Sequence, residues 1–399
     1  MNKKVLITAI ICSFLGLNFI FAPSCDARLT RKQKKELSYM NAAQLSFEKK
    51  EYDIAVEYYT KALALNPENS EAYAKRGNIF YLQNKYKEAI EDYTKSIEIN
   101  PNRENSYYNR GIANSNLKNY SEVITDYTKE LEVNPRNVNA YLNRGSVEVK
   151  LNNYQKAIDD FTKAIELDEN NINAYYNRGI AKRNNNDYKG AIEDYTKVIE
   201  LDDTNVEAYN NRGVAKYYLK DYQGAIHDYM KVIALDKNFK NVYFNKGLTN
   251  MGLKKYEEAI EDFTNEIALN PKNDLAYYDR GLCESRLKNY DSAIDDYTKA
   301  IEINPKNAEY YTDRGILISR TDEEQDLKKA EDDLGKAISL NNRDSEKYVI
   351  RAIIYCKMKL YLAAIDDLNI ALNIDPDNKQ AYDLRAFAIK SLSGVSKKK

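Results

Sequence analysis

The 399 residues contain one histidine, His227, so the side chain that most often serves as a general acid or base and as a metal ligand is almost missing. Glu193 and Glu261 stand 34 residues before and after it, which indicates a solvent-exposed position. A Ser-His or Cys-His pair, or a zinc site, would need partners that this pattern does not supply. We therefore predict no catalytic residue, no metal site and no enzyme activity.

The cysteines do not indicate redox chemistry either. Of the four, Cys12 and Cys25 belong to the N-terminal segment, whereas Cys283 and Cys356 are about two sequence periods apart. A disulfide needs Cα atoms within about 7 Å, and residues two periods apart should lie farther apart than that. We therefore expect Cys283 and Cys356 to be buried small residues. The recurring glycines stand alone and form no phosphate-binding loop. The sequence thus predicts no cofactor and no small-molecule substrate.

Basic residues and aspartates form the most regular charged pattern. The basic series is Arg76, Arg110, Arg144, Arg178, Arg212, Lys246, Arg280, Arg314, Arg351 and Arg385. The acidic series is Asp92, Asp126, Asp160, Asp194, Asp228, Asp262, Asp296, Asp333 and Asp367. We interpret them as a ladder of partly buried ion pairs that stabilises the fold, rather than as a ligand site. Whether each aspartate pairs within its own period or with the next stays open, because either choice leaves one arginine without a carboxylate.

The period itself predicts the elements that hold these residues. Glycine recurs every 34 residues, at Gly77, Gly111, Gly145, Gly179, Gly213, Gly247, Gly281 and Gly315. Each period contains two stretches, such as 174–181 and 188–199, whose apolar residues follow helical spacing. One helix pair cannot cover its own apolar stripes, but a stack of pairs can. The sequence therefore predicts an all-α fold built from stacked helix pairs.

Helix ends are also marked in each period. Most first helices should be capped by the side chain of Asn69, Asn137, Asn171, Asn205, Asn273, Asn307, Asp344 or Asn378. Most second helices should end before Pro67, Pro101, Pro135, Pro271, Pro305 or Pro376.

The recurring glycine lies inside the first helix, where it costs about 0.5–1 kcal/mol relative to alanine. We expect that glycine is needed because the two helices of a pair approach closely there. Gly179 should lie near Ala191, with the rings of Tyr175 and Tyr195 on either side.

The aromatic at position 4, glycine at 8, tyrosine at 17, alanine at 20, aromatic at 24 and proline at 32 resemble the tetratricopeptide repeat. Ten such repeats begin at residues 36, 70, 104, 138, 172, 206, 240, 274, 308 and 345. The resemblance implies a right-handed superhelical solenoid of helix-turn-helix repeats, whose concave groove most often binds proteins or peptides. The chain departs at position 7, where the family usually has leucine and the basic series stands here.

In this family, position 6 of the first helix faces the groove, and this chain carries five successive asparagines there: Asn109, Asn143, Asn177, Asn211 and Asn245. An amide donates and accepts, so these residues could hold the main chain of an extended peptide without reading its sequence. Aromatic residues nearby would add apolar contact area: Tyr108, Tyr176, Phe244, Tyr278 and Tyr217. The alternative is that the asparagines serve helix-helix contact only.

Residues 1–27 combine Lys3 and Lys4, an apolar run from Val5 to Ala22 and a small-residue stretch, which together predict an export signal. Three fates stay open: cleavage after Ala27, lipidation of Cys25, and retention as a membrane anchor. In each case the chain would contact a membrane only through this segment. We expect an exported protein that is periplasmic, envelope-associated or secreted.

The remaining segments are short. Residues 28–35 read as a solvated basic linker, and residues 379–393 as a capping helix that is followed by a lysine tail, 394–399. The ninth repeat is three residues longer than the others, and we place the excess in its turn, around residues 321–325. It is either a tolerated insertion or a contact point.

Charge and repeat together set the predicted function. Sixty basic residues balance 61 acidic ones, so no positive field favours nucleic acid. We predict a non-enzymatic, exported scaffold that binds a protein or an extended peptide. The alternative is a structural spacer or tether of a cell-envelope assembly. Because basic residues are few in the expected groove, we favour a neutral or mixed segment over an acidic carboxy terminus.

Overall fold

The computed structural model describes residues 29–103, 105–321 and 323–396, and its regular elements there are all α-helices. The predicted leader with Cys25 and the end of the lysine tail lie outside the described residues. The first helices of the repeats, called A helices, are α3 (Arg31–Glu48), α5 (Ser70–Leu82), α7 (Ser106–Asn116), α9 (Val138–Lys150), α11 (Ile172–Asn184), α13 (Val206–Tyr218), α15 (Val242–Gly252), α17 (Asp274–Arg286), α19 (Ala308–Ile318), α21 (Ser345–Lys357) and α23 (Lys379–Ser396).

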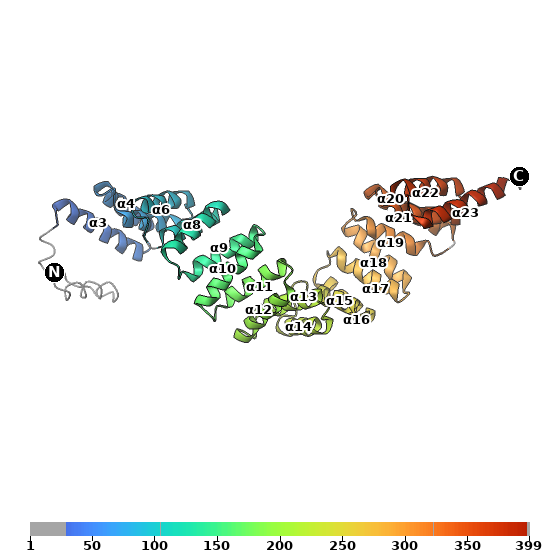
Figure 1. Cartoon of the computed structure of the whole chain (residues 1–399), viewed down its shortest axis with the longest axis horizontal. Helices are drawn as coiled ribbons and strands as arrows, with labels where there is room; N and C mark the ends of the chain where they lie inside the picture. Colours follow the sequence, from blue (N-terminus) through green and yellow to red (C-terminus); the bar gives the residue numbers. More distant parts are fainter. Residues whose placement is uncertain (1–28, 104, 322, 397–399) are drawn as a thin grey trace. The chain divides into compact units, whose positions relative to one another are not determined.

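The second helices, called B helices, are α4 (Tyr52–Leu65), α6 (Tyr86–Ile99), α8 (Tyr120–Val133), α10 (Tyr154–Leu167), α12 (Tyr188–Leu201), α14 (Tyr222–Leu235), α16 (Tyr256–Leu269), α18 (Tyr290–Ile303), α20 (Glu324–Leu340) and α22 (Tyr361–Ile374). The chain divides into two compact units, residues 1–181 and 182–399, with the boundary inside α11. Within each unit, A and B helices pack in consecutive pairs, and each B helix also packs on the next A helix (Figure 1). The predicted all-α solenoid of helix-turn-helix pairs is confirmed.

The predicted helix ends are confirmed. Asn69 Oδ1 accepts a hydrogen bond from the backbone N–H of Ala72, 2.9 Å away, and the other predicted caps also accept a backbone N–H: Asn137, Asn171, Asn205, Asn273, Asn307, Asp344 and Asn378. The B helices that precede the six prolines end two residues before them, as α4 does at Leu65 before Pro67. These ends depend on local chemistry, which is why the sequence marks them well.

The recurring glycine lies against the aromatic ring of its own B helix. A Cβ placed on Gly213 would come within 2.7 Å of Tyr229 Cε1, and one on Gly77 would lie 3.0 Å from Tyr93 Cε1 and 3.3 Å from the carbonyl oxygen of Ala89. The expected close approach is therefore present, and the side chain at position 24 is the nearest group, an aromatic ring in most repeats and Leu334 beside Gly315. Glycine makes room for a buried ring there.

Three segments differ from the sequence prediction. The basic linker is helical from Arg31 onward, because Thr30 and Gln33 form a capping box that starts α3. The last helix continues past Gly394 to Ser396. In the ninth repeat, the turn from Ser319 to Glu323 is lengthened, but the repeat also extends its B helix, since α20 has 17 residues and the other B helices have 14.

None of the helices in the described part of the chain has both the length and the apolar character needed to cross a bilayer.

Candidate binding groove

The ion-pair ladder joins eight of the basic residues to the aspartate of their own repeat, which settles the open register. Arg212 donates from Nε and Nη2 to the two carboxylate oxygens of Asp228, at 2.9 and 2.7 Å. Equivalent pairs are Arg76–Asp92, Arg110–Asp126, Arg144–Asp160, Lys246–Asp262, Arg280–Asp296, Arg314–Asp333 and Arg351–Asp367. Arg385 in α23 has no such carboxylate among the described residues.

The arginines also connect neighbouring repeats. Arg212 Nη1 donates to Thr196 Oγ1 of the preceding B helix at 3.1 Å, and Arg280 donates to Thr264 in the same way at 3.0 Å. Burial raises the pKa of a ladder carboxyl such as Asp296, while the hydrogen bond from Arg280 opposes the rise. With the donors of the guanidinium committed to protein oxygens, the ladder is structural, and the candidate site lies elsewhere.

Two neighbouring pockets lie along the A helices of the first unit. The first, of about 250 Å³, is lined by Asn78, Tyr81, Leu82, Tyr93, Asn109 and Ile112 of α5, α6 and α7. The second, of about 220 Å³, is lined by Ile112, Ser115, Asn116, Tyr127, Asn143, Ser146, Val147 and Lys150 of α7, α8 and α9. Ile112 belongs to both, so the pockets are contiguous. Each contains one asparagine of the predicted ladder.

Three of the five ladder asparagines donate to the A helix of the preceding repeat. Asn109 Nδ2 donates to Asn78 Oδ1 at 3.1 Å, and Asn143 Nδ2 donates to the hydroxyl of Tyr108 at 3.2 Å. In the second unit, Asn245 Nδ2 donates to Asn210 Oδ1 at 3.4 Å. These bonds support the helix-contact alternative. Because an amide can take part in about four hydrogen bonds, one such contact leaves capacity for a ligand.

The other predicted site residues are all half-buried. In the second unit, Asn211 Oδ1 accepts from Arg183 Nη1 at 3.1 Å, and Tyr217 packs edge-on against Tyr218. Asn177 and Tyr176 lie on α11. Tyr108, Phe244 and Tyr278 each pack against the position-24 ring of their own repeat, with centroids 5.7, 5.8 and 5.6 Å apart. The rings of Tyr108, Phe244 and Tyr278 therefore contribute to the cores of their own repeats, and none of them is among the residues that line the two pockets.

Sequence reasoning missed several residues that line the pockets. Asn78, Ile112 and Ser146 share position 9, and Tyr81 and Ser115 share position 12. The family resemblance places positions 9 and 12 of the first helix on the groove side, so the position of these residues within the repeat could have identified them. They were missed because their side chains vary, whereas the asparagines recur.

Neither His227 nor the cysteines of the described residues line the two pockets. His227 is exposed, as predicted. Cys283 is fully buried, and burial raises the pKa of its thiol to about 12, so the nucleophilic thiolate is suppressed. Cys356 is half-buried. No group of three or more histidine, cysteine, aspartate or glutamate side chains in the described residues is placed to hold a metal ion.

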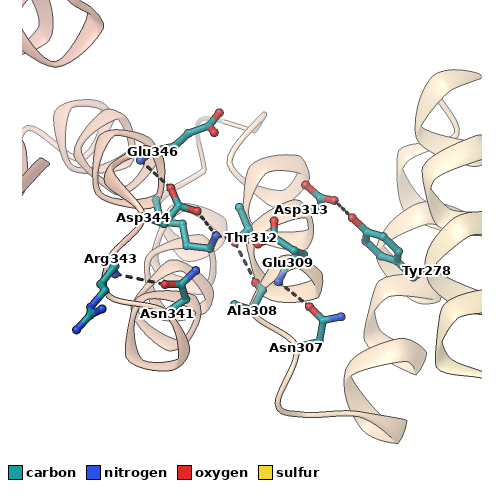
Figure 2. Close-up of polar contacts among 11 residues, drawn as sticks. Tyr278, Asn307, Ala308, Glu309, Thr312, Asp313, Asn341, Arg343, Asp344 and Glu346 are labelled. Carbon is teal, nitrogen blue, oxygen red and sulfur yellow. Dashed lines mark hydrogen bonds and ion pairs between the residues drawn. The ribbon is translucent and has the colours of Figure 1, made fainter. Parts of the chain in front are cut away.

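In the eighth and ninth repeats the amide register carries carboxylates, Asp279 and Asp313. Tyr278 donates from its hydroxyl to Asp313 at 2.7 Å (Figure 2). Nearby, Glu309 and Asp344 accept from the buried ammonium group of Lys347. Asp279 has no hydrogen-bond donor among the described residues, and burial raises the pKa of its carboxyl to about 7.

Asp279 should make stability depend on pH. Its folded pKa of about 7 exceeds the ordinary value of about 3.9, so the contribution of Asp279 to stability is greatest below the ordinary value and is lost as pH rises through the folded pKa. We expect Asp279→Asn to exceed the parent chain in unfolding free energy by at least about 1 kcal/mol at pH 8, and to show no advantage near pH 4. Urea unfolding at both pH values measures this, with the exposed Asp291→Asn as control. An equal difference at both pH values would contradict it.

Models of one repeat family match much of the chain. A family described as TPR repeat matches residues 43–83 and 77–118. Two described as tetratricopeptide repeat match residues 138–171, 172–205, 206–239 and 275–307, and residues 241–273. Together these matches cover more than half of the chain. No curated protein is similar enough in sequence to count as a match.

Solved structures of repeat proteins are also similar. The C-terminal part of a TPR repeat-containing protein from Cytophaga hutchinsonii is 20% identical, with a TM-score of 0.54, over 61% of this chain and 98% of that one. This likeness concerns the fold alone. MamA is 27% identical over 41% of this chain and 95% of its own, and YrrB, described as a TPR protein with an unusual peptide-binding site, is 24% identical over 45% and 92%; both have TM-scores of 0.40.

Proposed function

Because this chain belongs to the tetratricopeptide repeat family, whose members are protein-interaction scaffolds, we propose that it is a non-enzymatic scaffold that binds an extended segment of a partner protein along the groove face of its A helices. The observation that carries the proposal is the pair of contiguous pockets in the first unit, each with one ladder amide. Amides spaced by one repeat suit the alternating donors and acceptors of a peptide main chain.

The lining of the pockets indicates the kind of segment. Tyr81, Leu82 and Ile112 supply apolar surface, whereas Lys150 is the one charged side chain among the lining residues. A single ammonium group offers little to an acidic carboxy terminus. The favoured ligand is therefore a neutral or mixed segment that places apolar side chains in the pockets and its main chain near Asn109 and Asn143.

The experiment uses the full chain as bait for affinity capture and mass spectrometry, followed by titration with the captured segment. The double variant Asn109→Ala, Asn143→Ala should weaken binding by about 2 kcal/mol, at about 1 kcal/mol for each lost hydrogen bond. Asn170→Ala, an exposed loop amide, is the control. Circular dichroism confirms that the variants are folded. Undiminished binding by a folded double variant would refute the groove assignment.

A spacer or tether of an envelope assembly is the second candidate. It is favoured by one observation: Asn109, Asn143 and Asn245 already donate to neighbouring helices. A spacer needs these contacts and no ligand. If the double variant lowers the melting temperature while every captured partner binds as before, the spacer accounts better for the asparagines.

The proposal includes export, with the mature protein periplasmic, envelope-associated or secreted. It is supported by Lys3 and Lys4, the apolar run that follows, and Cys25. Mass spectrometry of the N-terminus of the natural protein tests it. Cleavage after Ala27 or a lipidated Cys25 is expected, and an intact Met1 on a cytosolic protein would contradict export.

A further inference from the structure

The helix α23 repeats the A-helix pattern, but one of its faces is not covered in the structure. Ala381 and Ala388 are fully buried in the core shared with α22. On the side where an A helix meets its own B helix, Tyr382 is 48% exposed and Ile389 is 51% exposed. In α21, the residue equivalent to Tyr382 is Tyr348, which is only 7% exposed.

The charged residue on this face also lacks its usual partner. In α21, Arg351 donates from Nε and Nη2 to Asp367 at 2.8 and 2.8 Å. In α23, Arg385 Nη1 donates to Asn369 of the preceding B helix at 2.9 Å, which corresponds to the arginine–threonine contact of other repeats. No described carboxylate meets its Nε and Nη2. The guanidinium is therefore placed for a carboxylate that the described residues do not supply.

We propose that the face formed by Tyr382, Arg385, Ala386 and Ile389 is a docking site for an amphipathic helix of a partner protein. The internal repeats define what fits. Most internal B helices present an aspartate to the basic residue, an aromatic or leucine next to it, and a small residue three positions before it, as Ala293, Asp296 and Tyr297 do in α18. The occupant is a helix with this alanine–aspartate–aromatic spacing.

Charge and shape complementarity support this occupant. A carboxylate on the docked helix can accept two parallel N–H groups from Arg385, a strong and directional contact. Burying Tyr382 and Ile389 removes apolar surface from water. Ala386 stands where most repeats have glycine. Alanine packs at this position beside an aromatic ring in the pair Ala43 and Tyr59 and beside leucine in the pair Ala352 and Leu368, so the occupant can carry either residue next to its aspartate.

The test probe is a labelled peptide with the sequence of residues 288–305. A lactam between Asp295 and Lys299, both exposed in α18, holds it helical, because a free peptide of this length is only marginally helical in water. Fluorescence anisotropy with the full chain should show saturable binding. Tyr382→Ala and Arg385→Ala should each weaken it by about tenfold or more. Phe387→Ala, on another side of the helix and 54% exposed, should leave it unchanged.

A probe with Asp296→Asn separates specific docking from general adhesion. It should bind the parent chain about tenfold less tightly and show almost no further loss with Arg385→Ala, because both changes remove one ion pair. Absent saturable binding, or equal binding by the Arg385→Ala chain, would overturn the proposal. If sedimentation shows that the chain alone forms a dimer and that Tyr382→Ala abolishes this dimer, the occupant is a second copy of the chain. That result also overturns the proposal. The Asn109→Ala, Asn143→Ala variant should bind the probe normally, so this test and the groove test fail independently.

Discussion

Replacing Asp228 with alanine is expected to lower the free energy of unfolding by about 3–5 kcal/mol, because it leaves two cationic side chains in a poorly solvated site without their carboxylate. Asp228 is fully buried and binds Arg212 through both oxygens. Its second oxygen also pairs with Lys216 at 2.8 Å. The Arg212 and Lys216 side chains are 13% and 16% exposed, so water cannot replace the lost partner fully.

Urea unfolding monitored by circular dichroism measures the effect of Asp228→Ala. The control is Glu57→Ala, which removes an exposed ion pair with Lys61 and should change stability by less than about 1 kcal/mol. Because each repeat stabilises its neighbours, the loss should appear as earlier unfolding of the helices around α14. A change no larger than that of Glu57→Ala would show that the ladder is dispensable.

Periodic, local features could be predicted from the sequence because each depends on a few adjacent residues. Asn69 and its equivalents cap helices within three residues of themselves, and Pro67 ends a helix beside it. The ladder register could not be predicted, since one spacing fits a partner in the same pair or in the next. It depends on how A and B helices lie together, which places Arg212 over Asp228.

Other details required information that the repeat does not carry. The capping box of Thr30 and Gln33 is visible in the sequence, but a run of basic residues concealed it. The ninth repeat lengthens both its turn and α20, because Glu324 to Asp326 can add helix ahead of Leu327 at low cost. For the groove, the register of Asn109 was predictable, whereas its bond to Asn78 depends on the distance between two A helices.

Replacing Gly213 with valine should lower the unfolding free energy by about 3 kcal/mol. A Cβ at this position lies within 2.7 Å of Tyr229 Cε1, and Tyr229 is 1% exposed, so the ring has no free space to enter. Overpacking of this kind costs about 1–3 kcal/mol, and valine regains little helix propensity over glycine. Gly335→Ala is the control, because its new Cβ would meet nothing closer than 3.7 Å. It should be neutral or stabilise the chain by up to about 1 kcal/mol.

A second substitution decides whether the ring causes this loss. The tenth repeat carries Ala352 and Leu368 where most other repeats have glycine and an aromatic, and both are fully buried. Gly213→Ala alone should destabilise the chain because its new Cβ would lie within 2.7 Å of Tyr229 Cε1. Gly213→Ala combined with Tyr229→Leu should be more stable than the sum of the single changes by at least about 1 kcal/mol. Additive losses in the double-mutant cycle would mean that the glycine recurs for another reason than the buried ring.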